Sequence, residues 1–193
     1  MLDLAILGLL REQPRHGYEL RRQLSDLGFW SVSFGSLYPA LRRLEKQSFI
    51  VTKDQSGRRK SYRITMEGQE HLQELLEDDT AIKDDDRSFS LRLAFFRYLE
   101  PDARIEVLER RRDHVSERLK NTKASIKARA NRTKEKIDRY TLALMEHGVR
   151  SAEADIAWLD ELIESELAIE PKRRERRRKR TTRSRRDLTN EGA

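Results

Sequence analysis

The 193 residues include 39% charged and only 7% aromatic side chains, and no cysteine. This composition favours long solvated helices over one thick core, and it excludes disulfide bonds and thiol chemistry. No apolar run approaches the roughly 18 residues of a membrane span, and the short apolar segment near the start lacks the basic flank of a secretion signal. We therefore expect a cytoplasmic protein that contacts no membrane.

The net charge of +7 is distributed unevenly along the chain. Residues 1–70 hold 12 basic and 8 acidic side chains (net +4), residues 71–170 hold 18 and 23 (net −5), and residues 171–193 hold 11 and 3 (net +8). Two basic regions therefore flank an acidic one. A polyanionic partner would contact the first region, the last one, or both.

The first two predicted helices cover residues 2–11 and 18–27. Apolar residues recur at helical spacing in both, and the segment 13–17, which contains Pro14 and Gly17, separates them. Tyr18 stands at the start of the second helix, where free backbone N–H groups and a phenol hydroxyl could bind phosphate. Simple packing of Tyr18 is an equal alternative.

The segment 35–47 predicts a short amphipathic helix around which the rest of the chain is organised. Ser36 is the expected N-cap, and Pro39 falls in the first turn, where a missing N–H breaks no intrahelical bond. Three leucines, Leu37, Leu41 and Leu44, share a face that must be buried. The opposite face suits phosphates and base edges, and its residues are Ser36, Tyr38, Pro39, Arg42, Arg43 and Lys46. The alternative is a surface helix with a merely solvated basic face.

A β-hairpin is predicted directly after this helix. Residues 49–52 and 58–64 are the expected strands, and the turn between them ends at Gly57, which adopts positive φ easily. Arg58, Arg59 and Lys60 place three cations beside the turn, from where they could reach a phosphate or the minor groove. A basic helix followed at once by a basic hairpin predicts a winged helix-turn-helix.

At these residues the chain resembles the PadR-like family of bacterial transcriptional regulators. The resemblance rests on ordered motifs: His16-Gly17-Tyr18-Glu19-Leu20, then Gly35-Ser36-Leu37-Tyr38-Pro39-Ala40-Leu41, then Gly57-Arg58-Arg59 with Tyr62-Arg63-Ile64-Thr65 and Gly68. Residues 88–168 resemble the longer helical C-terminal region of the subgroup related to virulence activators. One departure is Ser48, where the family usually has Gly. A non-Gly residue that adopts the left-handed conformation there costs about 1 kcal/mol.

The remainder of the chain is predicted to be helical. Thr65 is the expected N-cap of a helix that reaches about residue 84, and an apolar segment follows at 88–99. Apolar residues then alternate in steps of three and four over 105–126 and 142–163, which predicts two long helices that pack at a shallow angle. These seams could pair within the chain, with a second chain, or with both. The expected dimerisation residues are Leu93, Phe95, Phe96, Leu142, Met145, Val149, Ile156, Trp158, Leu159 and Ile163.

No catalytic or metal site is predicted. The four histidines are scattered, and neither a phosphate-binding glycine-rich loop nor a nucleophile motif is present. We therefore expect neither enzymatic activity nor a cofactor. The resemblance implies that some relatives bind small aromatic molecules. Phe89, Phe95, Phe96 and Trp158 could line such a site, although a dimer core needs the same residues.

The sequence thus predicts a mainly α protein with a small β-hairpin. A winged helix-turn-helix with a connecting helix is expected at 1–85, a dimerisation domain of long antiparallel helices at 86–170, and a disordered basic tail at 171–193, because Pro171 should end the last helix. The expected function is that of a DNA-binding regulator, a repressor as the resemblance implies, that binds an inverted-repeat operator as a homodimer. The alternative is a coiled-coil interaction protein whose basic tail binds nucleic acid nonspecifically.

Overall fold

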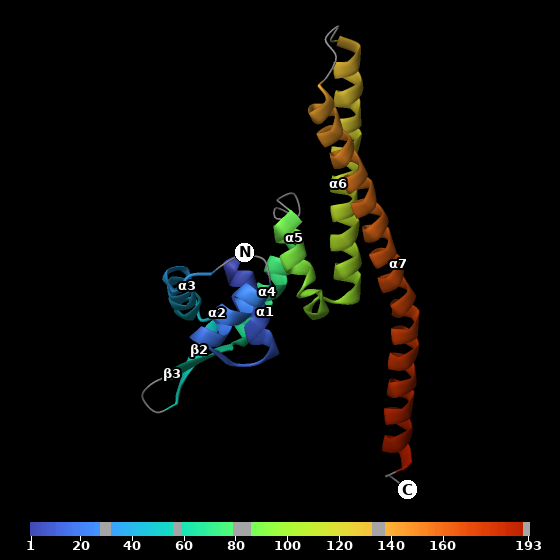
Figure 1. Cartoon of the computed structure of the whole chain (residues 1–193). Coiled ribbons are helices and arrows are strands. Elements are labelled where there is room, and N and C mark those ends of the chain that lie inside the picture. The colour runs from blue at the N-terminus through green and yellow to red at the C-terminus, as the bar shows by residue number, and fades with distance from the viewer. Residues whose placement is uncertain (28–31, 56–58, 79–85, 133–137, 191–193) are drawn as a thin grey trace. The chain divides into compact units, whose positions relative to one another are not determined.

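The structure, a computed structural model, describes residues 1–27, 32–55, 59–78, 86–132 and 138–190. It is mostly helical with one small antiparallel sheet, and it divides into two compact units, residues 1–100 and 101–193 (Figure 1). The predicted fold class is confirmed. Among the described residues, no helix is both long enough and apolar enough to cross a membrane.

The first unit, which we call the head, begins with three helices: α1 (Leu2–Glu12), α2 (Gly17–Asp26) and α3 (Phe34–Lys46). Each places an apolar face in a common core, which includes the fully buried Leu7, Leu20, Leu24, Leu37 and Leu41. The first two helices therefore occur close to where the sequence predicts them.

The third helix, α3, begins earlier than predicted. Ser33 is its N-cap, and the Ser33 Oγ accepts a hydrogen bond from the Ser36 backbone N–H at 3.2 Å. The prediction of Ser36 as N-cap was wrong because Ser33, three residues upstream, fills that role equally well. Pro39 consequently lies inside the helix rather than in its first turn, and it cannot donate to the Gly35 carbonyl.

The wing is the hairpin of β2 (Ile50–Gln55) and β3 (Arg59–Ile64), in which Ile50 pairs with Ile64. A two-residue strand, β1 (Arg15–His16), pairs with the other edge of β3, so the strand order is β1-β3-β2. The sequence shows only that the segment 13–17 separates two helices, because a strand of two residues is too short to show the alternation of apolar and polar side chains that marks a strand. Ile50 and Ile64 are buried, so the base of the wing belongs to the core of the head.

A tight junction joins α3, the wing and α4 (Met66–Glu77). Ser48 follows α3 in the left-handed conformation, with φ 62°, so the cost of a non-Gly residue in this conformation applies here. Thr65 is confirmed as the N-cap of α4: its Oγ1 accepts from the Gly68 N–H at 3.0 Å and donates to the Ser48 carbonyl at 2.7 Å. The helix ends at Glu77, short of the predicted residue 84, and residues 79–85 lie outside the described part of the chain.

A short helix, α5 (Asp86–Leu93), and a 3₁₀ turn, η2 (Phe96–Tyr98), also belong to the head. The Phe95 ring packs so closely on α1 that a Cβ added to Gly8 would lie 2.6 Å from it. Phe95 and Phe96 are therefore buried within a single chain. The first compact unit extends to residue 100, beyond residue 85 where the sequence predicts a domain boundary, and Phe95 of the apolar segment packs on α1 within that unit.

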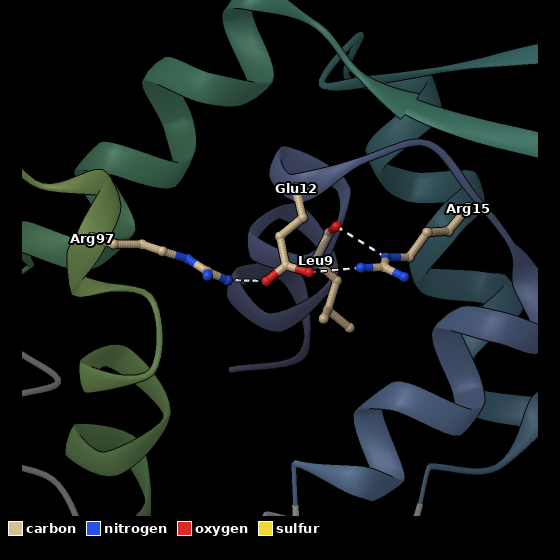
Figure 2. Close-up of polar contacts among 4 residues, drawn as sticks. All are labelled: Leu9, Glu12, Arg15 and Arg97. Atoms are coloured by element: carbon tan, nitrogen blue, oxygen red, sulfur yellow. Dashed lines mark hydrogen bonds and ion pairs between the residues drawn. The ribbon is translucent and has the colours of Figure 1, made fainter.

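Glu12 at the end of α1 links the turn η2, which carries Arg97, to the strand β1, which carries Arg15 (Figure 2). One carboxylate oxygen accepts a hydrogen bond from Arg15 Nη2 at 2.6 Å, and the other accepts one from Arg97 Nη2. Arg15 is buried, and its Nε donates to the Leu9 carbonyl at 3.2 Å. One carboxylate thus balances a buried guanidinium, which would otherwise be strongly destabilising, and an exposed one.

The second unit consists of α6 (Pro101–Arg132) and α7 (Arg139–Asn190), which lie side by side (Figure 1). Ion pairs between them, Arg104–Glu166, Arg112–Asp160 and Lys123–Glu153, run in opposite order along the two helices, as antiparallel packing requires. The buried seam side chains are Val107, Leu108, Val115, Ala152, Leu159 and Ile163. The two predicted seams therefore pair with each other within one chain.

The last helix, α7, continues through both of its suspected interruptions. It passes Gly148 without a break, as predicted, and its backbone stays helical beyond Pro171 to Asn190. This helical backbone over residues 171–190 differs from the disordered tail that the sequence predicts. Arg and Lys are good helix formers, and they continue the helix although Pro171 removes the hydrogen bond to the Leu167 carbonyl and crowds that carbonyl with its ring. Beyond Ile169 only the backbone of this helix is described.

Candidate nucleic-acid interface

The exposed side of α3 carries all six residues that the sequence singles out on this helix. Leu37, Ala40, Leu41 and Leu44 are buried beneath it. The exposed residues are Ser36, Tyr38, Pro39, Arg42, Arg43 and Lys46. We call this surface the reading face. It presents cations and hydroxyls on a rigid helix, which is the chemistry that binds phosphates and base edges.

Tyr38 joins one edge of the reading face to the start of α2. A Cβ added to Gly17 would lie 3.1 Å from the Tyr38 hydroxyl oxygen and 3.2 Å from its ring, so the missing side chain leaves room for Tyr38. The Phe34 ring stacks on Tyr38 with the centroids 5.9 Å apart, and the Arg21 guanidinium lies 4.2 Å from the Phe34 centroid. Phe34 is exposed and was not predicted, because an apolar residue before a helix gives no signal of binding.

The first turn of α2 is fixed by a capping box. Glu19 accepts a hydrogen bond from the His16 backbone N–H at 2.8 Å and another from the Tyr18 hydroxyl at 3.3 Å. The backbone bond chiefly lowers the pKa of Glu19, against the opposing effect of burial. Because Glu19 is ionised and engaged with these donors, it holds Tyr18 at the surface beside the reading face.

His16 connects the same turn to the wing. Its Nδ1 lies 3.2 Å from the Lys60 carbonyl oxygen, which can only accept, so Nδ1 carries the proton in this bond. The His16 ring also stacks on Tyr18, with centroids 6.0 Å apart. Lys60 is exposed, as predicted. Arg58 and the side chain of Arg59 lie outside the described residues.

The wing is also connected to α3 itself. Thr52 of β2 donates to the Glu45 carboxylate at 2.7 Å. Tyr62 of β3 is buried, and this burial raises its pKa, with smaller contributions from Glu45 and Tyr38 that Arg42 opposes. The hydrogen bond between Thr52 and Glu45 therefore holds α3 against the wing.

Arg43 marks the other edge, where a carboxylate from α1 meets it. Arg43 Nη2 donates to Asp3 Oδ1 at 2.5 Å. Sequence reasoning missed this contact, because 40 residues separate the two partners and nothing local links them. No group of three or more His, Asp or Glu that could hold a metal ion occurs among the residues that the structure describes.

Comparison with known proteins decides the family. Residues 6–74 match the transcriptional regulator PadR-like family, and residues 87–165 match the virulence activator alpha C-term family. The chain belongs to the PadR-like family of transcriptional regulators. The second match begins in α5, so its first part belongs to the head of this PadR-like protein.

The similar curated proteins come from several bacteria. This PadR-like chain is 34% identical over 89 residues to an uncharacterized protein of Lysinibacillus sphaericus, covering 43% of this chain and 82% of that protein. It is 36% identical over 75 residues to the transcriptional regulator YqjI of Escherichia coli, and 35% identical over 82 residues to the negative transcriptional regulator PadR of Bacillus subtilis. These two matches cover 38% and 39% of this chain, but only 36% and 45% of the relatives.

Solved structures include two informative neighbours. A transcriptional regulator from Clostridium thermocellum is 34% identical, over 37% of this chain and 72% of its own, with a TM-score of 0.34. Bacillus subtilis PadR in complex with operator DNA is 23% identical, over 86% of this chain and 98% of its own, with a TM-score of 0.39. Because both TM-scores lie below 0.5, the family match, and not a superposition of whole chains, carries the assignment.

Proposed function

We propose that this PadR-like regulator represses transcription by binding an inverted-repeat operator as a homodimer. The observation that carries the proposal is the reading face: Arg42, Arg43 and Lys46 stand exposed beside the hydroxyls of Ser36 and Tyr38 on a helix whose other side is buried. An exposed helix of this kind fits the major groove. The sense of repression rests on the Bacillus subtilis relative, which is named a negative regulator.

Each part of the surface has a proposed role. Ser36 and Pro39 enter the groove first, where the proline ring can contact a thymine methyl group. Arg42 reaches guanine or a phosphate. Tyr38 and Tyr18 bind phosphates from the flank, because both lie beside the first turn of α2. Lys60 extends this contact through the wing, and the same role is proposed from the sequence for Arg58 and Arg59.

The proposed dimer contact is an apolar stripe on α7. Tyr140, Leu144, Trp158 and Ile169 are 79%, 71%, 43% and 47% exposed. Their spacings of 4, 14 and 11 residues are close to whole numbers of helical turns, so they share one face. That face differs from the seam of Leu159 and Ile163, which α6 already covers. Such a stripe is unfavourable in water, and a two-fold related copy would bury it on both chains at once.

The experiment that tests the function is a gel-shift titration with the DNA upstream of the protein's own gene, in the presence of excess competitor DNA. Tyr38→Ala and Lys60→Ala should weaken binding without changing the circular dichroism spectrum, because both side chains are exposed. Lys120→Ala is the matched control, since Lys120 is an exposed lysine of α6. If the wild type and all three variants bind with equal affinity, DNA does not bind at α3 and the wing.

A further inference from the structure

We propose that Asp3 determines how strongly the protein prefers its operator over random DNA, by holding the guanidinium of Arg43. The inference rests on the proposed function, because Arg43 belongs to the reading face. Asp3 itself would contact no base. It is a specificity-determining residue that acts through Arg43.

The geometry singles out this pair. Asp3 lies in the first turn of α1 and Arg43 in the last turn of α3, and Arg43 Nη2 donates to Asp3 Oδ1 at 2.5 Å. The two side chains remain 27% and 54% exposed, so DNA can still reach the arginine. Within the described part of the chain, neither Arg42 nor Lys46 forms an ion pair. The reading face therefore has two cations without an acidic partner and one that is balanced by a carboxylate.

Stability alone does not account for this carboxylate. Exposed ion pairs contribute little to folding. Asp3 is also already placed favourably, since the N-terminal end of a helix stabilises a negative charge without help from an arginine. The larger consequence of the pair is its effect on the electric field of the reading face. There, one negative charge cancels much of the attraction that one guanidinium exerts on phosphates.

Random DNA and operator DNA should respond differently to this cancellation. Random DNA is bound through its phosphates, so a neutralised Arg43 adds little to that binding. An operator also offers a base edge at a fixed position. The N–H groups of Arg43 that Asp3 does not engage can still donate to such an edge, and the ion pair holds the guanidinium in place. Asp3 thus weakens the attraction of Arg43 to phosphates, which is independent of sequence, and leaves the hydrogen bonds of Arg43 to a base edge intact.

The test compares wild type with Asp3→Asn, which keeps the size and the oxygen acceptor of the side chain but removes its charge. Both proteins are titrated at several salt concentrations on operator DNA and on random DNA of equal length. For Asp3→Asn we expect random DNA to bind roughly two- to fivefold tighter, the range that one exposed ion pair supports. The slope of log K against log salt should steepen by about 0.9, for one additional phosphate that the protein neutralises. Operator affinity should change less, so the preference falls.

Two controls separate this mechanism from a diffuse charge effect. Asp102→Asn makes the same charge change in the first turn of α6, and it should leave binding to random DNA as it is in the wild type. In an Arg43→Ala background, Asp3→Asn should have no further effect. If the Asp3→Asn effect persists without Arg43, Asp3 does not act through the arginine and the proposal is overturned.

A second variant changes the arginine of the Asp3–Arg43 pair. Arg43→Lys keeps the positive charge but loses the fork of N–H donors, so operator affinity should fall while random DNA binds as before. If wild type prefers its operator and both Asp3→Asn and Arg43→Lys leave that preference unchanged, only this inference is overturned. If wild type binds no DNA at all, the proposed function fails and takes the inference with it.

Discussion

Gly68→Ala should destabilise the head more than any single surface change, because the space for a methyl group is filled by backbone. A Cβ at Gly68 would lie 2.0 Å from the Phe49 carbonyl oxygen and 2.9 Å from Ile64 Cγ1. The alanine Cβ and the Phe49 oxygen must move about 1 Å apart, because real Cβ atoms almost never lie within 3.0 Å of another heavy atom. The Phe49 carbonyl cannot simply yield, since it accepts a hydrogen bond from the Thr65 backbone N–H at 3.1 Å, and the Thr65 hydroxyl, which donates to the Ser48 carbonyl, also lies 3.1 Å from it.

The magnitude follows from these contacts. Overpacking of a tight site costs about 1–3 kcal/mol, and a weakened N-cap at Thr65 adds about 1 kcal/mol. Because Gly68 lies in α4, the helix propensity of alanine offsets up to about 1 kcal/mol of this cost, and we expect a net loss of roughly 1–3 kcal/mol in the free energy of unfolding of the head. For a domain of this size, each kcal/mol lowers Tm by about 4–8 °C, so the transition should fall by at least about 4 °C.

Differential scanning calorimetry of the full chain measures this shift, with Gly148→Ala as the matched control. Gly148 also lies inside a helix, but a Cβ there would meet nothing within 4 Å. Gly148→Ala should therefore be stabilising, by about 1 kcal/mol, through helix propensity alone. A Gly68→Ala variant that melts at or above the wild-type temperature would refute the reasoning, as would a Gly148→Ala variant that melts clearly below it.

Four further outcomes are expected. Gly17→Ala should push the Tyr38 ring aside by a few tenths of an ångström and weaken DNA binding, with little change in the melting temperature. Trp158→Asp should shift the mass measured by light scattering toward the monomer, because it places a charge in the proposed dimer contact; an unchanged dimer would place that contact elsewhere. A chain truncated after Glu170 should bind random DNA more weakly and show a shallower salt slope, by about 0.9 for each phosphate that the tail neutralises in the full chain. Because burial raises the pKa of Tyr62 above its unfolded value near 10, the associated stability is full below that pH and is lost as the pH rises through the folded pKa. Chemical denaturation of Tyr62→Phe between pH 9 and 11 should show a smaller loss than wild type.

Much of the head could be predicted from the sequence because its signals are local. The leucine spacing of α3 fixes which side is buried, and this alone places Arg42 and Lys46 at the surface. Thr65 was identifiable as an N-cap from its own neighbourhood. The family resemblance, which puts a glycine at Ser48, raised the left-handed conformation there as a condition, and the structure has it.

What could not be predicted depends on contacts between distant residues. The packing of Phe95 on Gly8 gives no local signal, so an apolar segment that closes the head was expected to contribute to a dimer. Heptad spacing shows that a seam exists but not which helix covers it, and here α6 and α7 cover each other. The pairing of Asp3 with Arg43 likewise depends on how α1 and α3 cross in three dimensions.

Footprinting on the DNA upstream of the protein's own gene tests the central claim most directly. We predict two protected half-sites related as an inverted repeat, with centres about 34 Å or a small multiple apart, because a two-fold dimer presents two identical heads. The family resemblance suggests half-sites like ATGT and ACAT. The same fragment should lose its protection when the footprint is repeated with Tyr38→Ala at equal concentration. Protection of one unrepeated site by a monomer, or no protection at all, would contradict the proposed function.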